Sequence, residues 1–208
     1  MRRAFITLLL ALSACSTLSV PSSVVPQKAS DWKAVVTDED RARLSGWRKD
    51  FTAALVEARK AGHAAEIARE GALLSPDAAL PDPAIPNGLY RCRVIKVGSK
   101  TPELLPFVSY PPFTCQVAQS GKVQSFAKLN GSQRQVGTLF PNDSLRSVFL
   151  GTLVLGDESR ALRYGADDDR DVAGYLERIE PDRWRLAMPS PHFESKLDVL
   201  ELVPAGKE

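Results

Sequence analysis

The sequence has little of the chemistry on which most enzyme motifs depend. Its 208 residues include only three cysteines and two histidines, His63 and His192. No G-x-S-x-G nucleophile motif, H-E-x-x-H zinc motif, glycine-rich phosphate loop or dinucleotide fingerprint occurs. Without a C-x-x-C pair, the histidines do not complete a structural zinc set. The sequence therefore predicts no catalytic residue, no metal site and no cofactor.

A large charge excess and long apolar runs are also absent. The chain carries 27 Lys and Arg against 25 Asp and Glu, so it lacks the strong positive field of proteins that bind nucleic acids. Its most hydrophobic run, residues 4–12, falls well short of the about 20 residues that a membrane helix needs. We expect neither a nucleic-acid partner nor a membrane-spanning helix.

The start of the chain has the layout of a secretory signal peptide. Two arginines precede the apolar run, and small residues follow it. The stretch Leu12-Ser13-Ala14-Cys15 resembles the bacterial lipobox, in which the cysteine receives a diacylglycerol before cleavage makes it the N-terminus. We expect residues 1–14 to be the signal peptide and residues 15–30 to be a lipidated N-terminus and flexible tether, with Cys15 as the attachment site.

A lipid on Cys15 would also fix the location of the protein. Two or three acyl chains, palmitate among them, anchor a protein stably, whereas one chain does not. By resemblance to sorted lipoproteins, Ser16 in place of an aspartate favours the outer membrane, with the rest of the chain facing the periplasm. The alternative is an ordinary signal peptide with a chance cysteine, which would give a secreted periplasmic protein.

The other two cysteines, Cys92 and Cys115, form an even pair in a compartment where disulfides persist. Each lies in a β-like run, two residues before a valine on the same face. We expect them to form a disulfide. Two free buried thiols remain the alternative.

A helical segment is predicted over residues 31–79. Thr37 is a candidate N-cap followed by three acids in the first turn, and Gly62 is placed to end the helix. A second helix is expected over residues 64–74. Apolar residues recur at helical spacing in the first helix: Leu44, Trp47, Phe51, Leu55 and Ala58. This stripe suits a face that packs on the main domain, or a groove for a partner protein.

From residue 80 to residue 208 the period changes to two, which predicts an antiparallel β domain. The candidate strands are residues 89–97, 113–119, 122–129, 133–140, 145–155, 160–164, 172–179, 184–188 and 197–203. Short turns separate most of them, so consecutive strands are expected to pair. The predicted fold is mainly β with an N-terminal helical segment, its meander forming a small closed or strongly curled barrel. A two-sheet sandwich is the alternative.

Two places in the β domain are candidates for binding chemistry. Arg134 and Gln133 follow the tight turn at Asn130-Gly131. They are candidates to bind a carboxylate or phosphate at the barrel rim. Equally, they could hold the hairpin together. His192 and Glu194 lie two residues apart near the C-terminus. They supply residue types used by hydrolases, but a loop or capping role explains them as well.

Many segments of the chain resemble, in order, the proteobacterial family known as domain of unknown function 4893. They include GLYRCRVIKVG, YPPFTCQV, FAKLNGSQR, FLGTLVLGDE, RDVAGYLERI, RWRLAMP and PHFESKLDVLELVP. The resemblance covers roughly residues 32–204. It implies an envelope protein, often with a signal peptide, and supplies no reaction, cofactor or binding residue.

These observations favour a non-enzymatic outer-membrane lipoprotein whose barrel binds an apolar or amphipathic molecule, or an envelope protein. The plan is similar to lipocalins and to periplasmic inhibitors, although the G-x-W lipocalin start is missing and a shared plan does not imply a shared function. The alternative is a protein-interaction or inhibitor module of the envelope. An envelope hydrolase that uses His192 and Glu194 is a third hypothesis.

Overall fold

The structure is a computed structural model and describes residues 29–206. The expected signal peptide, the lipidation site Cys15 and all but the end of the tether lie outside the described residues. Within residues 29–206, no helix is both long enough and apolar enough to cross a membrane.

The helices come first along the chain, and the strands follow. Helix α1 spans Asp38–Ala58 and α2 spans Ala64–Arg69. The segment Arg59–His63 between them is kinked at Gly62, whose φ of +99° is not helical, as the expected helix end at this glycine predicted. 3₁₀ turns lie at Trp32–Ala34 and Gly71–Leu74. The strands are β1 (Gly88–Ser99), β2 (Phe107–Ser109), β3 (Phe113–Ser120), β4 (Val123–Lys128), β5 (Gln133–Pro141), β6 (Ser147–Leu155), β7 (Asp171–Glu180), β8 (Arg183–Pro189) and β9 (Ser195–Pro204).

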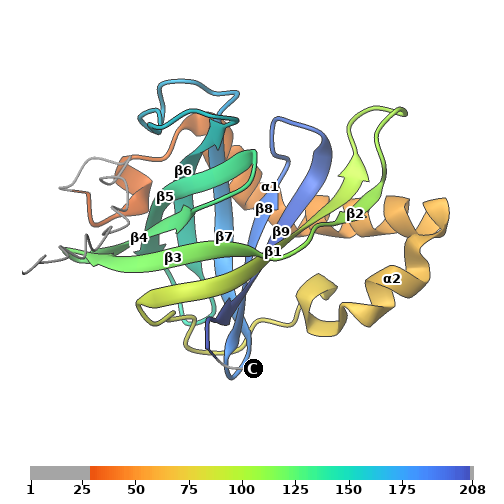
Figure 1. Cartoon of the computed structure of the whole chain (residues 1–208), viewed down its shortest axis with the longest axis horizontal. Coiled ribbons are helices and arrows are strands. Elements are labelled where there is room, and N and C mark those ends of the chain that lie inside the picture. Colours follow the sequence, from red (N-terminus) through yellow and green to blue (C-terminus); the bar gives the residue numbers. More distant parts are fainter. Residues whose placement is uncertain (1–28, 207–208) are drawn as a thin grey trace, which may run out of the picture.

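The strands form a closed antiparallel barrel, as Figure 1 shows. Strands β3 to β9 pair in chain order, and β1 pairs with both β3 and β9, which closes the sheet into eight strands. Strand β2 pairs only with β1 and extends as an arm beside the barrel. The predicted closed barrel is confirmed, and the sandwich does not form.

Side chains fill the barrel interior through most of its length. The rings of Phe126 and Phe149 meet edge to face at 5.6 Å between centroids, and those of Tyr90 and Trp184 at 6.2 Å. The segment before β1 covers the end of the barrel where Tyr90 and Trp184 lie. Its backbone carbonyls accept hydrogen bonds from the Trp184 indole and the Tyr90 hydroxyl. Small barrels of about eight strands have interiors that side chains can fill, and buried aromatic and aliphatic side chains fill this one.

Helix α1 packs along the outside of the barrel, as the stripe at helical spacing predicted. The Thr37 hydroxyl accepts a hydrogen bond from the Asp40 amide, so the expected N-cap is present. Apolar side chains of α1 join a buried cluster with β1, β8 and β9. Trp47 is partly buried and meets Tyr175 of β7 at 5.9 Å between ring centroids. The stripe is therefore a packing face.

Two local predictions differ from the structure. Residues 160–164 form a loop instead of a strand, because Tyr164 is buried against α1, where its hydroxyl donates to the Asp40 carboxylate at 2.6 Å. Strand β2 was not predicted, since its three residues lie between prolines and are too short for a periodic pattern.

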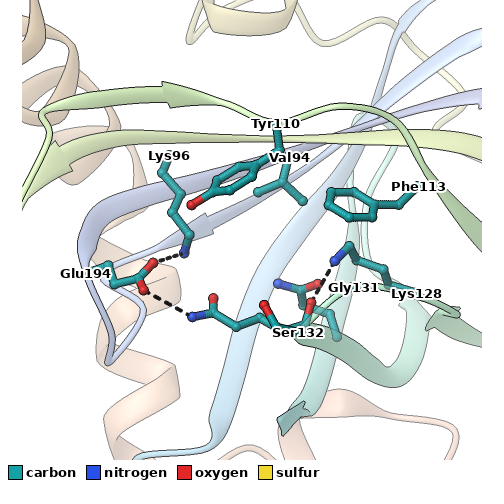
Figure 2. Close-up of a pocket in the computed structure, with 10 residues that line it drawn as sticks. Val94, Lys96, Tyr110, Phe113, Lys128, Gly131, Ser132 and Glu194 are labelled. Atoms are coloured by element: carbon teal, nitrogen blue, oxygen red, sulfur yellow. Dashed lines mark hydrogen bonds and ion pairs between the residues drawn. The ribbon is translucent and has the colours of Figure 1, made fainter. Parts of the chain in front are cut away.

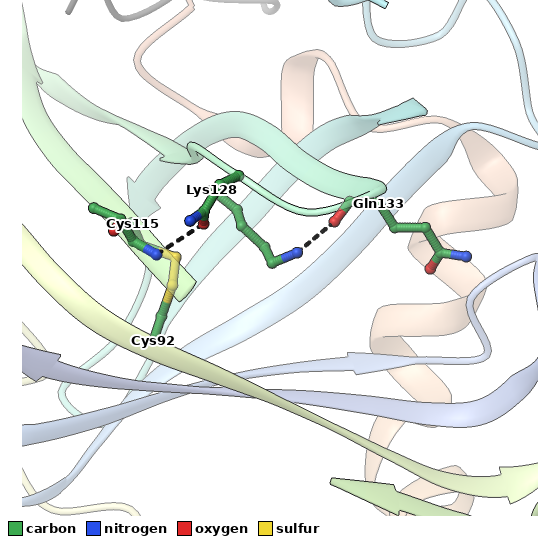
Figure 3. Close-up of a disulfide and its surroundings, with 6 residues drawn as sticks. Cys92, Cys115, Lys128 and Gln133 are labelled. Atoms are coloured by element: carbon green, nitrogen blue, oxygen red, sulfur yellow. Dashed lines mark hydrogen bonds between the residues drawn. A yellow bond between two sulfur atoms is a disulfide. The ribbon is translucent and has the colours of Figure 1, made fainter. Parts of the chain in front are cut away.

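The predicted disulfide is present between Cys92 and Cys115 (Figure 3). Both cysteines are fully buried, and they link β1 to β3. The β1–β3 pairing covers Gly88 to Cys92 and ends there, after which β1 pairs with β2 instead. The disulfide therefore lies where β1 and β3 separate.

Candidate ligand-binding site

A pocket of about 330 Å³ opens where β1 and β3 separate (Figure 2). Its walls come from strands β1, β3, β4 and β5, the turn between β4 and β5, and the loops before β3 and β9. The lining residues are Val94, Lys96, Tyr110, Phe113, Lys128, Gly131, Ser132, Gln133, Gln135 and Glu194. The pocket thus joins an apolar and aromatic wall to a polar one at one end of the barrel.

Lys128 is a buried cation in this pocket. The residue is 4% exposed, and its Nζ donates to the Gln133 carbonyl oxygen at 2.7 Å and lies 3.7 Å from the Phe113 ring centroid. Among the ion pairs of residues 29–206, none includes Lys128. Burial lowers the pKa of Lys128 to about 8, and the positive charges of Arg134 and Lys96 act in the same direction.

Gly131 makes room for this lysine. Its φ of +89° is a conformation that side chains other than glycine rarely adopt. A Cβ at this position would lie 2.7 Å from Lys128 Nζ and 2.9 Å from Phe113 Cε1. The glycine of the Asn130-Gly131 turn therefore serves the pocket as well as the turn.

Gln135 is the second unusual polar group of the pocket. The residue is 2% exposed, and its Oε1 has no hydrogen-bond partner among residues 29–206. Buried polar atoms are nearly always hydrogen-bonded, so such an exception calls for an explanation. A donor from a bound molecule would satisfy this oxygen.

Lys96 differs from Lys128 because carboxylates neutralise it. Its Nζ lies 3.1 Å from Asp198 Oδ2 and 3.2 Å from Glu194 Oε2. Burial disfavours the charged form, but Asp198 and Glu194 outweigh that effect and raise the pKa of Lys96. Lys96 is therefore held as a cation and does not suit the role of a general base.

The structure places two of the four candidate binding residues in the pocket. Gln133 and Glu194 line it, and their side chains approach at 3.4 Å between Nε2 and Oε1 (Figure 2). Arg134 does not line it: its guanidinium donates to the carbonyl oxygens of Gly131, Gly156 and Glu158, which holds two loops together.

His192 lies on the surface outside the pocket lining. Its Nδ1 is 3.0 Å from Asp169 Oδ1, and its ring packs edge to face on Phe193. The His192 side chain therefore contacts Asp169 and Phe193, whereas Glu194, with which the hydrolase hypothesis combined it, pairs with Lys96. Across residues 29–206, no cluster of His, Cys, Asp and Glu suits a metal ion.

Sequence reasoning missed Lys96, Lys128 and Gln135, although a signal for them exists. Inward-facing positions alternate along each strand, and they change from apolar to polar toward one end. In β1 the inward residues Cys92 and Val94 are followed by Lys96; in β4 Phe126 is followed by Lys128. The same change in several strands marks the polar end of the barrel.

Comparison with known proteins supports the resemblance noted in the sequence. No match was found among curated proteins or among solved structures. One family model matches residues 32–202, which is most of the chain. The chain therefore belongs to the family described as domain of unknown function (DUF4893).

Proposed function

We propose that the protein is a non-enzymatic binding module whose pocket at the end of the barrel takes a small amphipathic molecule. The observation that carries this proposal is the two-sided lining of the pocket. Val94, Tyr110 and Phe113 offer apolar and aromatic surface. Lys128 offers a cation that no carboxylate of residues 29–206 pairs with, and Gln135 offers an oxygen without a hydrogen-bond donor. Small-molecule sites combine hydrophobic and aromatic surface with a few placed polar groups; in this pocket the polar side chains outnumber the apolar ones, which suits an amphipathic ligand and not a purely apolar one.

The dimensions restrict the ligand. At about 330 Å³ the pocket is near the small end of the range for ligand sites, roughly 300–1,000 Å³. Buried side chains, among them Phe126 and Phe149, fill the interior below it, which disfavours a long acyl chain. The proposed ligand is therefore compact and lies at the mouth of the barrel.

We further propose that the protein is an outer-membrane lipoprotein facing the periplasm, with Cys15 as the lipid anchor. The basic start, short apolar run and lipobox-like stretch support this location. The disulfide supports an oxidising compartment, because disulfides are rare in the cytosol.

A protein-interaction module is the second candidate. The loop between β1 and β2 exposes Leu104 and Leu105, the latter 69% exposed, next to the rim residue Tyr110. These side chains could contact an envelope protein. Because the stripe of α1 packs on the barrel, with Trp47 partly buried against Tyr175, the proposed contact surface for such a partner is the loop and not this helix face.

Mass spectrometry tests both parts of the proposal. We expect the denatured protein from the envelope fraction to begin at Cys15 and to carry acyl chains, and a Cys15→Ser variant to lack them. For the ligand, residues 29–208 would be exported to the periplasm, purified without detergent and weighed under native and denaturing conditions. The native mass is expected to exceed the denatured mass by that of a small molecule.

The two readouts fail separately. An unmodified Cys15 in the denatured protein would contradict the lipid anchor. A bare native domain with an intact disulfide would count against the ligand, and cross-linking in the envelope would then test for a partner at Leu105.

A further inference from the structure

We infer that the ligand carries an acidic group, a carboxylate or a phosphate, and that Lys128 binds it at the inner wall of the pocket while the Gln135 amide oxygen accepts a neighbouring hydroxyl or N–H of the same molecule. This inference rests on the proposed function and gives it a chemical class. It follows from the charges, the free hydrogen-bonding groups and the arrangement of the lining residues.

The charges of the pocket single out Lys128. Lys96 has two carboxylates within 3.2 Å. Lys128 is as deeply buried, but its contacts are a backbone carbonyl and the face of Phe113. A buried charge is costly unless it is paired. An anion at Lys128 would supply the missing counter-charge.

The hydrogen-bonding groups lead to the same conclusion. A lysine ammonium has three donors, and one of those of Lys128 goes to the Gln133 carbonyl oxygen. Figure 2 shows its Nζ between Phe113 and the turn that carries Gly131 and Ser132. Within the described part of the chain the other donors have no hydrogen-bond partner, so a ligand oxygen can accept from them. A charge-assisted bond of this kind is stronger than a neutral one.

The arrangement of charges sets the orientation of the ligand. Glu194 lies at the exposed rim, next to Lys96, and its negative charge would repel the acidic group of the ligand there. The acidic group is therefore directed to Lys128, and the apolar part lies against Val94 and Tyr110. The oxygen of Gln135 has no hydrogen-bond partner among residues 29–206 and can accept a hydroxyl or N–H next to the acid.

Two fluorescent probes that differ in one acidic group test this inference. Anilinonaphthalene sulfonate has an aromatic body, an N–H and a sulfonate that stands in for a carboxylate or phosphate. Phenylnaphthylamine has the same body and N–H without the acid. Dissociation constants would be measured for both with the full chain carrying Cys15→Ser, which leaves every lining residue unchanged.

We expect the Cys15→Ser protein, in which Lys128 is unchanged, to bind the sulfonate probe more tightly than the neutral probe. Lys128→Met is expected to weaken the sulfonate probe by roughly tenfold or more and to leave the neutral probe unchanged, because it removes a charge-assisted bond. Lys49→Met, at an exposed position of α1, is the matched control and should change neither constant. Lys128→Gln repeats the test with a polar side chain, and circular dichroism verifies that each variant is folded.

The other outcomes separate the two proposals. If both probes bind equally and Lys128→Met changes neither, the acidic group is wrong but the pocket still binds amphipathic molecules. If Lys128→Met weakens both probes alike, Lys128 supports the pocket wall and does not bind the acid. If neither probe binds the Cys15→Ser protein, in which Lys128 is unchanged, this inference and the proposed function both fail.

Discussion

Replacing Arg185 with methionine is expected to lower the free energy of unfolding by about 3 kcal/mol, the lower part of the range for breaking a buried ion pair. Arg185 is fully buried, and its guanidinium binds the Glu177 carboxylate at 2.6 Å. It also donates to four carbonyl oxygens at and after the turn Gly71–Leu74. Arg146 still contacts Glu177 at 2.7 Å, which is why we expect the lower figure.

Urea denaturation of the Arg185→Met variant measures this effect, and Arg48→Met provides the control. Arg48 pairs with Asp77 at 2.7 Å, but both side chains are mostly exposed. Exposed pairs contribute about 1 kcal/mol or less, so the control should differ little from the parent protein. Equal losses of unfolding free energy in the two variants would show that the buried contacts of Arg185 do not stabilise the packing of the helical segment on the barrel.

Replacing Cys92 and Cys115 together with alanine is expected to cost about 3 kcal/mol in the chain-entropy model. The bond closes a loop with a sequence separation of 23 residues, which contains β2 and the exposed leucines. It also links β1 and β3 where their pairing ends, and Lys128 lies directly across the ladder from Cys115. We therefore expect the double variant to lose stability and to bind the sulfonate probe more weakly.

Denaturant unfolding and thiol labelling check this prediction. The parent chain carrying Cys15→Ser should show no free thiol when denatured without reductant, and reduction should lower its stability to that of the double variant. Two labelled thiols before reduction, or a stability unaffected by reduction, would contradict the account of the disulfide.

The sequence predicted the elements of the fold well where the signal is local. Alternation along the strands, the Thr37 cap and the stripe of α1 depend on neighbouring residues, and the structure confirms them. Residues 160–164 were wrongly predicted to be a strand. They form a loop because Tyr164 is held by Asp40, which is far away in the sequence. Strand β2 depends on its pairing with β1 and has no pattern of its own.

The site was less predictable than the fold because it is assembled from distant segments. Gln133 and Glu194 were identified from polar clusters in the sequence, and they do line the pocket. Lys128 and Gln135 can be identified as binding residues only in the closed barrel, where both are buried. There, among residues 29–206, Lys128 has no counter-ion and the Gln135 oxygen has no hydrogen-bond donor. The sequence shows that they are polar, but burial and missing partners are properties of the closed fold.

The central claim is that the open end of the barrel, and not its filled interior or its helical face, is the binding site. The most direct measurement is a titration of the protein with anilinonaphthalene sulfonate, followed residue by residue in amide NMR spectra. The account predicts that the largest shift changes occur at Lys96, Lys128, Gln133, Gln135 and Glu194. Changes centred on α2, or on the hollow at the opposite end of the barrel around Val123 and Gln124, would contradict it.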